Sequence, residues 1–141
     1  VSMLARTSGL IMAIFGFSLG GAAHAQIALM PATEVHERVE AGAILLVDVR
    51  TPREWAQTGM AQGASGIVLQ DPEFLTKLET LTGGAKDTPV AFICRSGARS
   101  GKATQMAMQA GYTHVYNVPH GTMTPGGWIS SGLPVQAYAG E

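Results

Sequence analysis

Short apolar runs alternate with segments of helical periodicity along most of the chain. Two of these runs, Ile44–Val47 and Pro89–Ile93, lack polar alternation, which is typical of strands buried on both faces of a parallel sheet. Two further strand candidates are Gly66–Leu69 and His114–Val118. Because strands that alternate with helices favour crossover connections, we expect one α/β domain with a central, mostly parallel sheet of about five strands and helices on both faces.

The helical segments lie between these runs. The clearest start is at Thr51, which can cap a helix that has Pro52 at its first position and Glu54 completing a capping box. The other helices are expected at residues 32–41, 71–82 and 100–110. Glu54 is therefore interpreted as a capping residue rather than as a catalytic one.

The first 25 residues have the pattern of a secretory signal peptide. Arg6 supplies the positive charge, Leu10–Leu19 the apolar region, and Ala23–Ala25 the small residues of a cleavage site. The apolar region is shorter than the about 20 residues that a transmembrane helix needs. We expect a signal peptide over residues 1–25, a mature domain over residues 26–141 that is periplasmic or otherwise exported, and no membrane contact after cleavage. The alternative is an uncleaved membrane anchor.

Composition excludes several classes of function. A formal net charge of −1, without a clustered basic run, argues against a nucleic-acid partner, because neutralising phosphates needs a cationic surface. Cys94 is the single cysteine, so the chain can form neither an internal disulfide nor a zinc site with several thiolates. His36 and His114 lack metal-ligand spacing, and we expect both to be exposed. No metal and no cofactor are predicted.

The loop Cys94–Ser100 is the segment best suited to chemistry, because it follows a buried strand and leads into a helix. Backbone N–H groups in such a turn can form an anion-binding nest, which the positive end of the helix dipole reinforces. Thiol pKa values fall at helix N-termini beside arginine. We expect Cys94 to be an accessible nucleophile. The expected substrate-binding residues are Arg95, Ser96, Gly97, Ala98, Arg99 and Ser100.

An inert core cysteine is the alternative interpretation of Cys94, since a cysteine after an apolar strand is often only a small buried hydrophobe. An inert thiol gains nothing from neighbouring cations, however. Arg95 and Arg99 also oppose the helix dipole at this end of the helix. Some anionic group should therefore lie nearby to offset their charge.

The run Cys94–Ser100 resembles the active-site loop of rhodanese-domain sulfurtransferases. Further segments similar to that family follow in the same order: Leu46–Trp55 with its Asp-Val-Arg signature, Gly59–Ala64, Gly111–Val118, Trp128 and Gly132–Val135. The resemblance spans essentially the whole mature chain. One segment departs from the family pattern, because Pro119–Met123 and extra residues stand where many members have a Gly-Gly pair. We expect that loop, which contains His120, to border the pocket.

The resemblance implies a covalent, two-step transfer of sulfane sulfur. A small anionic donor such as thiosulfate would give its outer sulfur to Cys94 as a persulfide, and Arg95 and Arg99 would attract that donor. The acceptor would be a small nucleophile such as cyanide, or a thiol on a partner protein. No cofactor is implied.

Two other functions stay open. A phosphatase or arsenate reductase also uses a Cys-loop-Arg cradle, but Cys-x5-Arg loops place five residues between the two, whereas four lie between Cys94 and Arg99. A non-catalytic rhodanese-like binding module is the second alternative, although such modules typically lack the cysteine. Outside the loop, structural roles are expected for Asp48, for Arg50 as the partner of a carboxylate, and for both tryptophans.

Overall fold

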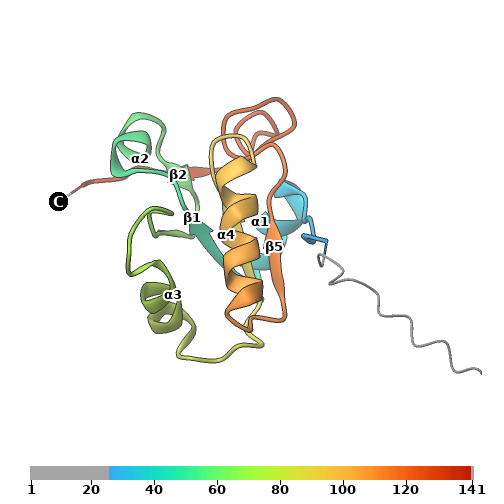
Figure 1. Ribbon diagram of the computed structural model, residues 1–141. Coiled ribbons are helices and arrows are strands. Elements are labelled where there is room, and N and C mark those ends of the chain that lie inside the picture. The colour runs from blue at the N-terminus through green and yellow to red at the C-terminus, as the bar shows by residue number, and fades with distance from the viewer. Residues whose placement is uncertain (1–25, 141) are drawn as a thin grey trace, which may run out of the picture.

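The computed structural model describes residues 26–140 (Figure 1). The expected signal peptide over residues 1–25 lies outside the described residues. Within them, no helix is long and apolar enough to cross a membrane.

The centre of the domain is a parallel sheet in the order β3-β1-β4-β5. Its strands are β1 (Leu45–Asp48), β3 (Ala64–Gly66), β4 (Val90–Ile93) and β5 (Val115–Asn117). Two short strands, β2 (Met60–Ala61) and β6 (Val135–Gln136), form a separate antiparallel pair. The predicted α/β class is confirmed, with four strands in the central sheet where about five were expected.

The strand predicted at Gly66–Leu69 is wrong in its position. β3 ends at Gly66, where that prediction begins. Ile67 and Leu69 bury their side chains, and their N–H groups donate to the backbone oxygens of Asp48 and Val49, but no strand ladder continues there. The apolar run therefore reflects burial of a connecting segment rather than a strand.

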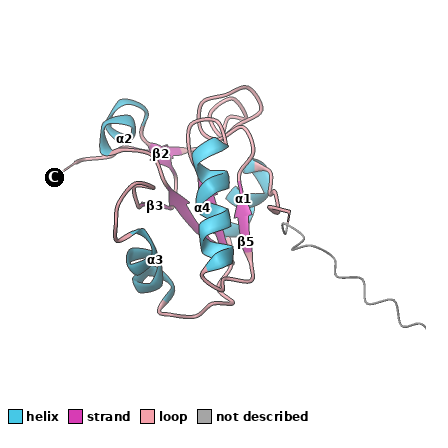
Figure 2. Ribbon diagram, viewed as in Figure 1, coloured by secondary structure: helices cyan, strands magenta, loops and turns pink. Residues whose placement is uncertain are grey.

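Four helices surround the sheet (Figure 2). They are α1 (Ala32–Glu40), α2 (Pro52–Thr58), α3 (Phe74–Thr82) and α4 (Ala98–Gln109). All four were predicted, and the capping box of Thr51 and Glu54 is present at the start of α2. Helix α4 begins earlier than expected because Gly97, with a φ of 107°, turns the chain directly into the helix.

Two apolar clusters lie on opposite faces of the sheet, because neighbouring strand residues point to opposite sides. On one face, Leu46 of β1 packs in a cluster with residues of α1 and α2. On the other face, Val47 and Phe92 pack with residues of α3 and α4. Helices on both faces are thus confirmed, and Cys94 belongs to the α3–α4 side.

The order of the strands determines where a ligand site can form. From β1 the chain crosses outward to β3 and then returns to β4 on the other side of β1. The segments that leave β1 and β4 consequently diverge, α2 packing on one face and α4 on the other. In open α/β sheets, ligands bind at such a switch point, beyond the carboxyl ends of the strands. Cys94 follows β4 at this point.

Candidate active site around Cys94

The Cys94 side chain lies at the base of the loop between β4 and α4 and is only 1% exposed. Its sulfur packs with the apolar cluster on the α3–α4 face. The expectation of an accessible thiol is therefore wrong for the side chain as a whole. Arg95 and Ser96, the next two residues, are exposed and form the outer rim of the loop.

Two donors of the loop point at the Cys94 sulfur. The Gly97 N–H lies 3.1 Å from Sγ, and the Ser100 hydroxyl oxygen lies 3.2 Å from it. Burial raises the pKa of Cys94, but hydrogen bonds from the Ser100 side chain and from the backbone of Ser100, Gly97 and Ser96 outweigh it, so that the pKa lies below its ordinary value. The loop is thus built to accept negative charge on sulfur.

The two arginines of the loop have different surroundings. Arg95 is exposed, whereas Arg99 is partly buried in a bidentate ion pair with Glu54. The guanidinium nitrogens of Arg99 lie 2.8 and 2.7 Å from the two carboxylate oxygens. The hydrogen bond from Arg99 lowers the pKa of Glu54 to about 2, and the same contact raises the pKa of Arg99. For Arg99, Glu54 is the anionic group expected near the start of α4.

The segment after β5 closes over the Cys94 loop, as expected from the sequence (Figure 1). The N–H and the hydroxyl of Thr122 both donate to the carbonyl oxygen of Cys94, at 2.8 and 3.0 Å, and the Met123 N–H donates to the carbonyl of Arg95. A Cβ on Gly121, whose φ is 56°, would lie 2.5 Å from the backbone of Cys94 and Arg95. The two segments therefore fit only because residue 121 has no side chain.

Asn117, at the end of β5, completes the polar surroundings of the sulfur. Its Oδ1 lies 2.6 Å from the Ser100 hydroxyl, and its Nδ2 donates to the carbonyl oxygen of Gly97 at 3.1 Å. Asn117 is buried. It thus connects the strand to both residues that contact Sγ.

The family model described as a rhodanese-like domain matches residues 31–123, which include this loop. The chain belongs to the rhodanese-like domain family. A sulfurtransferase of Allochromatium vinosum is 40% identical over 97 residues, which cover 69% of this chain and 82% of that protein. The chloroplastic thiosulfate sulfurtransferase 16 of Arabidopsis thaliana is 35% identical over 114 residues, covering 74% and 89% of the two chains. These named relatives support a sulfurtransferase.

A solved structure shows the same architecture. The rhodanese-related protein from Thermoplasma volcanium has a TM-score of 0.64 and 27% identity to this chain, and the similarity covers 79% of this chain and 99% of that one. The fold of this rhodanese-like domain and its recognition from the sequence are both confirmed.

A second ion pair supports the neighbouring strand end in this rhodanese-like domain. Arg50 and Asp48 are both fully buried, and the Arg50 guanidinium lies 2.8 Å from the Asp48 carboxylate. Arg50 also donates to the hydroxyl of Thr58 and to the carbonyl of Gly59. The predicted structural roles of Asp48 and Arg50 are confirmed, because the two side chains form an ion pair with each other and Arg50 also binds the end of α2.

The tryptophans and histidines named from the sequence lie in different surroundings. Both tryptophans are buried packing residues, and His114 is exposed, as predicted. His36 is only partly exposed, because its ring packs edge-on against Trp128 at a centroid distance of 5.7 Å, so its predicted exposure is wrong. Among residues 26–140, no group of three or more His, Cys, Asp or Glu side chains could hold a metal ion.

Asn117 and Thr122 belong to the site but are not among the residues predicted from the sequence. Thr122 supports the Cys94 loop by donating a hydrogen bond to the Cys94 carbonyl oxygen, a contact that no local sequence motif predicts. For Asn117 a signal existed, since it is a polar residue within the apolar strand run 114–118. A buried polar side chain needs partners, and here the partners are the loop that holds the cysteine.

Proposed function

We propose that this protein moves sulfane sulfur from a small anionic donor to a thiophilic acceptor through a persulfide on Cys94. The observation that carries the proposal is the pair of donors, Gly97 N–H and Ser100 hydroxyl, aimed at the sulfur of the chain's single cysteine. Donors that stabilise a thiolate favour nucleophilic attack by that sulfur at neutral pH.

In the first step, the Cys94 thiolate attacks the outer sulfur of thiosulfate. A new S–S bond forms to Cys94 while the S–S bond of the donor breaks, and sulfite leaves with the bonding electron pair. In the second step, cyanide or a thiolate attacks the outer sulfur of the persulfide. That sulfur leaves as thiocyanate or as a new persulfide, and the electron pair returns to Cys94 as thiolate.

Thiosulfate is the donor we propose, in keeping with the name of the Arabidopsis relative. Arg95 is exposed beside Cys94 and is in none of the ion pairs formed within residues 26–140, so its charge is available to an anionic donor. For Arg99, which the sequence suggests as a donor-binding residue, we propose a different role, because its guanidinium pairs with Glu54. We therefore assign Arg99 to positioning the loop and Arg95 to attracting the donor.

The surroundings of Cys94 favour sulfur transfer over phosphate-ester hydrolysis. A cysteine phosphatase needs an arginine free to clamp a tetrahedral oxyanion, whereas both terminal nitrogens of Arg99 bind Glu54. Cys94 is also buried, which suits the transfer of a single sulfur atom rather than of a bulky group. The cysteine and its donors likewise argue against a purely non-catalytic binding module.

The test compares the parent protein with Cys94→Ser and Cys94→Ala in two assays. We expect thiocyanate production from thiosulfate and cyanide in the parent protein only, and no hydrolysis of an aryl phosphate by any of the three. Circular dichroism controls for folding. Substantial thiocyanate production by a well-folded Cys94 variant, or phosphatase activity that depends on Cys94, would refute the proposal.

A further inference from the structure

The Ser100 hydroxyl lies between two acceptors but has one proton to donate. Its oxygen is 2.6 Å from Asn117 Oδ1 and 3.2 Å from Cys94 Sγ. The Gly97 carbonyl oxygen can only accept hydrogen bonds, and it accepts from the Gly101 N–H as well as from Asn117. The amide group that faces it is therefore Nδ2, and Oδ1 faces Ser100. Only one of the two acceptors can receive the Ser100 proton at a time.

The position of Asn117 is fixed independently of this hydrogen bond. Its backbone N–H donates to the carbonyl of Ala28, and its carbonyl accepts from the N–H of Met30. Opposite the amide, α4 has Gly101, where a Cβ would lie 3.3 Å from Nδ2. Glycine within a helix costs about 1 kcal/mol relative to alanine. Gly101 therefore lowers the stability of α4 but leaves room for the Asn117 amide. The asparagine is thus held in place against Ser100.

The state of the sulfur decides where the Ser100 proton goes. A neutral Cys94 thiol can donate to the Ser100 oxygen, and Ser100 then donates to Asn117, so every group has a partner. A thiolate has no proton to give and draws the Ser100 proton to itself, which leaves the buried Asn117 Oδ1 without a donor. A buried acceptor that loses its partner costs free energy, and this cost falls only on the thiolate.

We propose that Asn117 is a positioning residue that competes with the Cys94 sulfur for the Ser100 proton and so makes the free thiolate more basic. The remaining donors to the sulfur still stabilise the thiolate. Asn117 limits that stabilisation, and the sulfur keeps more of its nucleophilic strength, which rises with thiol basicity.

Resting on the proposed function, the same competition favours the sulfur-loaded protein. In a persulfide the negative charge lies on the outer sulfur, and Sγ is a neutral, bonded atom. Ser100 can then return its proton to Asn117, so the cost present in the thiolate is absent in the persulfide. Asn117 therefore shifts the exchange with thiosulfate and sulfite toward the persulfide.

Charged groups around Cys94 also influence its titration and must stay constant in a test. These groups are Arg99 with Glu54, Arg50 with Asp48, and Arg95 in the loop itself. None of them is among the hydrogen-bond partners of the Asn117 side chain, which are Ser100 and Gly97. Substitutions at Asn117 therefore change the competition for the proton without removing a charge.

The test titrates the single thiol through the pH dependence of its alkylation by iodoacetamide. In Asn117→Leu, which keeps the γ-branched shape but has no acceptor, the midpoint should fall by about one pH unit, on the scale of one buried hydrogen bond. Asn117→Ala provides a second acceptor-free variant if the leucine packs poorly.

Ser100→Ala is the control that separates this role from simple support of the loop. If Asn117 acts through the Ser100 proton, Asn117→Leu should leave the midpoint unchanged in a Ser100→Ala background. A loosened loop would instead raise the midpoint in both backgrounds, because the Gly97 donor would move away from the sulfur. A midpoint in Asn117→Leu at or above that of the parent, or an equal shift in both backgrounds, would overturn the inference.

Persulfide occupancy at a fixed ratio of thiosulfate to sulfite tests the second part. It should be several-fold lower in Asn117→Leu than in the parent protein, and equal occupancy would contradict this part of the inference. If no variant and no parent protein forms a persulfide, the proposed function fails, while the titration still decides the role of Asn117.

Discussion

Arg99 and Glu54 form a bidentate ion pair, with nitrogen–oxygen distances of 2.7 and 2.8 Å, between positions 45 residues apart in the chain. Glu54 belongs to the capping box of α2, and Arg99 lies in the first turn of α4. The pair therefore connects the two helices that diverge from the switch point of the sheet. It holds the start of α4, and with it the loop of Cys94, against α2.

The two arginines of the loop should respond differently to substitution. Arg95→Ala should lower kcat/KM for thiosulfate by about 10- to 100-fold, the scale of one charge-assisted contact, with little change in stability. Arg99→Ala should lower kcat/KM and should also lower the free energy of unfolding, because Glu54 loses its ion-pair partner. Steady-state kinetics and urea unfolding measure both effects.

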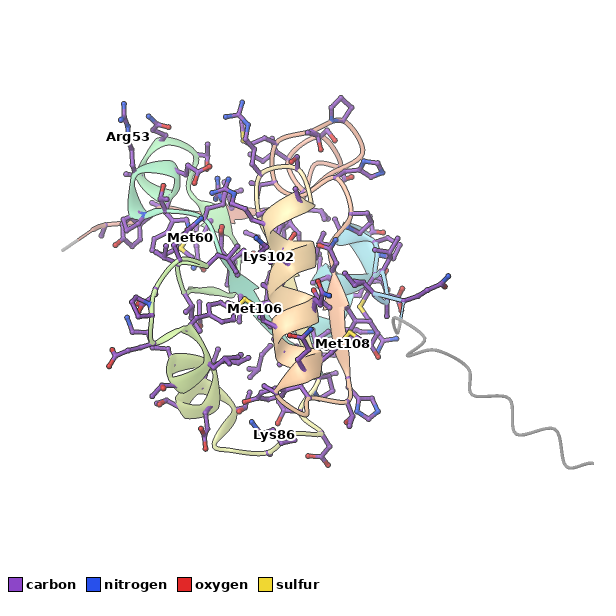
Figure 3. All side chains as sticks on the ribbon, in the orientation of Figure 1. Arg53, Met60, Lys86, Lys102, Met106 and Met108 are labelled. Carbon is purple, nitrogen blue, oxygen red and sulfur yellow. The ribbon has the colours of Figure 1, made fainter. Side chains whose placement is uncertain are left out.

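Arg53→Ala is the matched control, since Arg53 is an exposed arginine whose side chain extends away from the domain at α2 (Figure 3). It should leave both kinetics and stability unchanged. An Arg95→Ala variant that uses thiosulfate as well as the Arg53→Ala variant would show that Arg95 is an ordinary surface residue.

The contribution of the Arg99–Glu54 pair to stability should persist at mildly acidic pH. Since the pKa of Glu54 falls from 4.5 to about 2, its contribution to stability is fully present above its ordinary pKa and is lost as the pH falls toward 2. Glu54→Gln should therefore cost about 1–2 kcal/mol near neutral pH, a value reduced by partial solvent exposure, and progressively less below about pH 4.5.

Glu34→Gln provides the comparison, because Glu34 pairs with Arg38 at 2.8 Å but both side chains are 45% exposed. That variant should cost about 0.5 kcal/mol or less. Urea unfolding of the three proteins across the acidic range gives the answer. A cost for Glu54→Gln that does not shrink with falling pH would show that the pair is not its cause.

The local features of the site could be predicted from the sequence, whereas its long-range contacts could not. The Cys94 loop and the capping box of Thr51 and Glu54 are each formed by consecutive or nearly consecutive residues, and both are present. The contact of Asn117 with Ser100 depends on the pairing of β5 beside β4, which no spacing in the chain encodes.

Burial was the other property that the sequence pattern misjudged. The position of Cys94 after a strand and at the start of a loop predicts an accessible side chain, yet Cys94 is buried in the apolar cluster on the α3–α4 face. Ile67 and Leu69 show the converse, since their apolar run predicts a strand but belongs to a buried connecting segment. Apolar character predicts burial more reliably than it predicts the backbone conformation.

Gly121 should not tolerate a side chain. Gly121→Ala should destabilise the protein by about 2–4 kcal/mol and impair sulfur transfer, because the Cβ would meet the backbone of Cys94 and Arg95 at 2.5 Å. Gly132→Ala is the matched control: Gly132 also has a positive φ, 72°, but nothing lies within 4 Å of its Cβ position. Gly132→Ala should lower the free energy of unfolding by only about 1–2 kcal/mol, the cost of placing alanine in a left-handed backbone conformation. Equal effects of the two variants on unfolding and activity would show that the close approach is unimportant.

Export is proposed from residues 1–25, whose pattern is that of a cleavable signal. Expressed in a Gram-negative host, the protein should be recovered from the periplasm with Gln26 as its first residue. N-terminal sequencing of the periplasmic protein measures this directly. Recovery of the uncut chain in the membrane fraction would favour the anchor, and recovery in the cytoplasm would contradict export.

Whether Cys94 carries sulfur is tested most directly by the intact mass of the purified protein before and after treatment with thiosulfate. Cys94 is the chain's single cysteine, so any persulfide on a thiol can be assigned without ambiguity. We predict a mass increase of one sulfur atom, complete reversal by cyanide with release of thiocyanate, and no increase in Cys94→Ala. An unchanged mass in the parent protein, or the same increase in Cys94→Ala, would contradict the account.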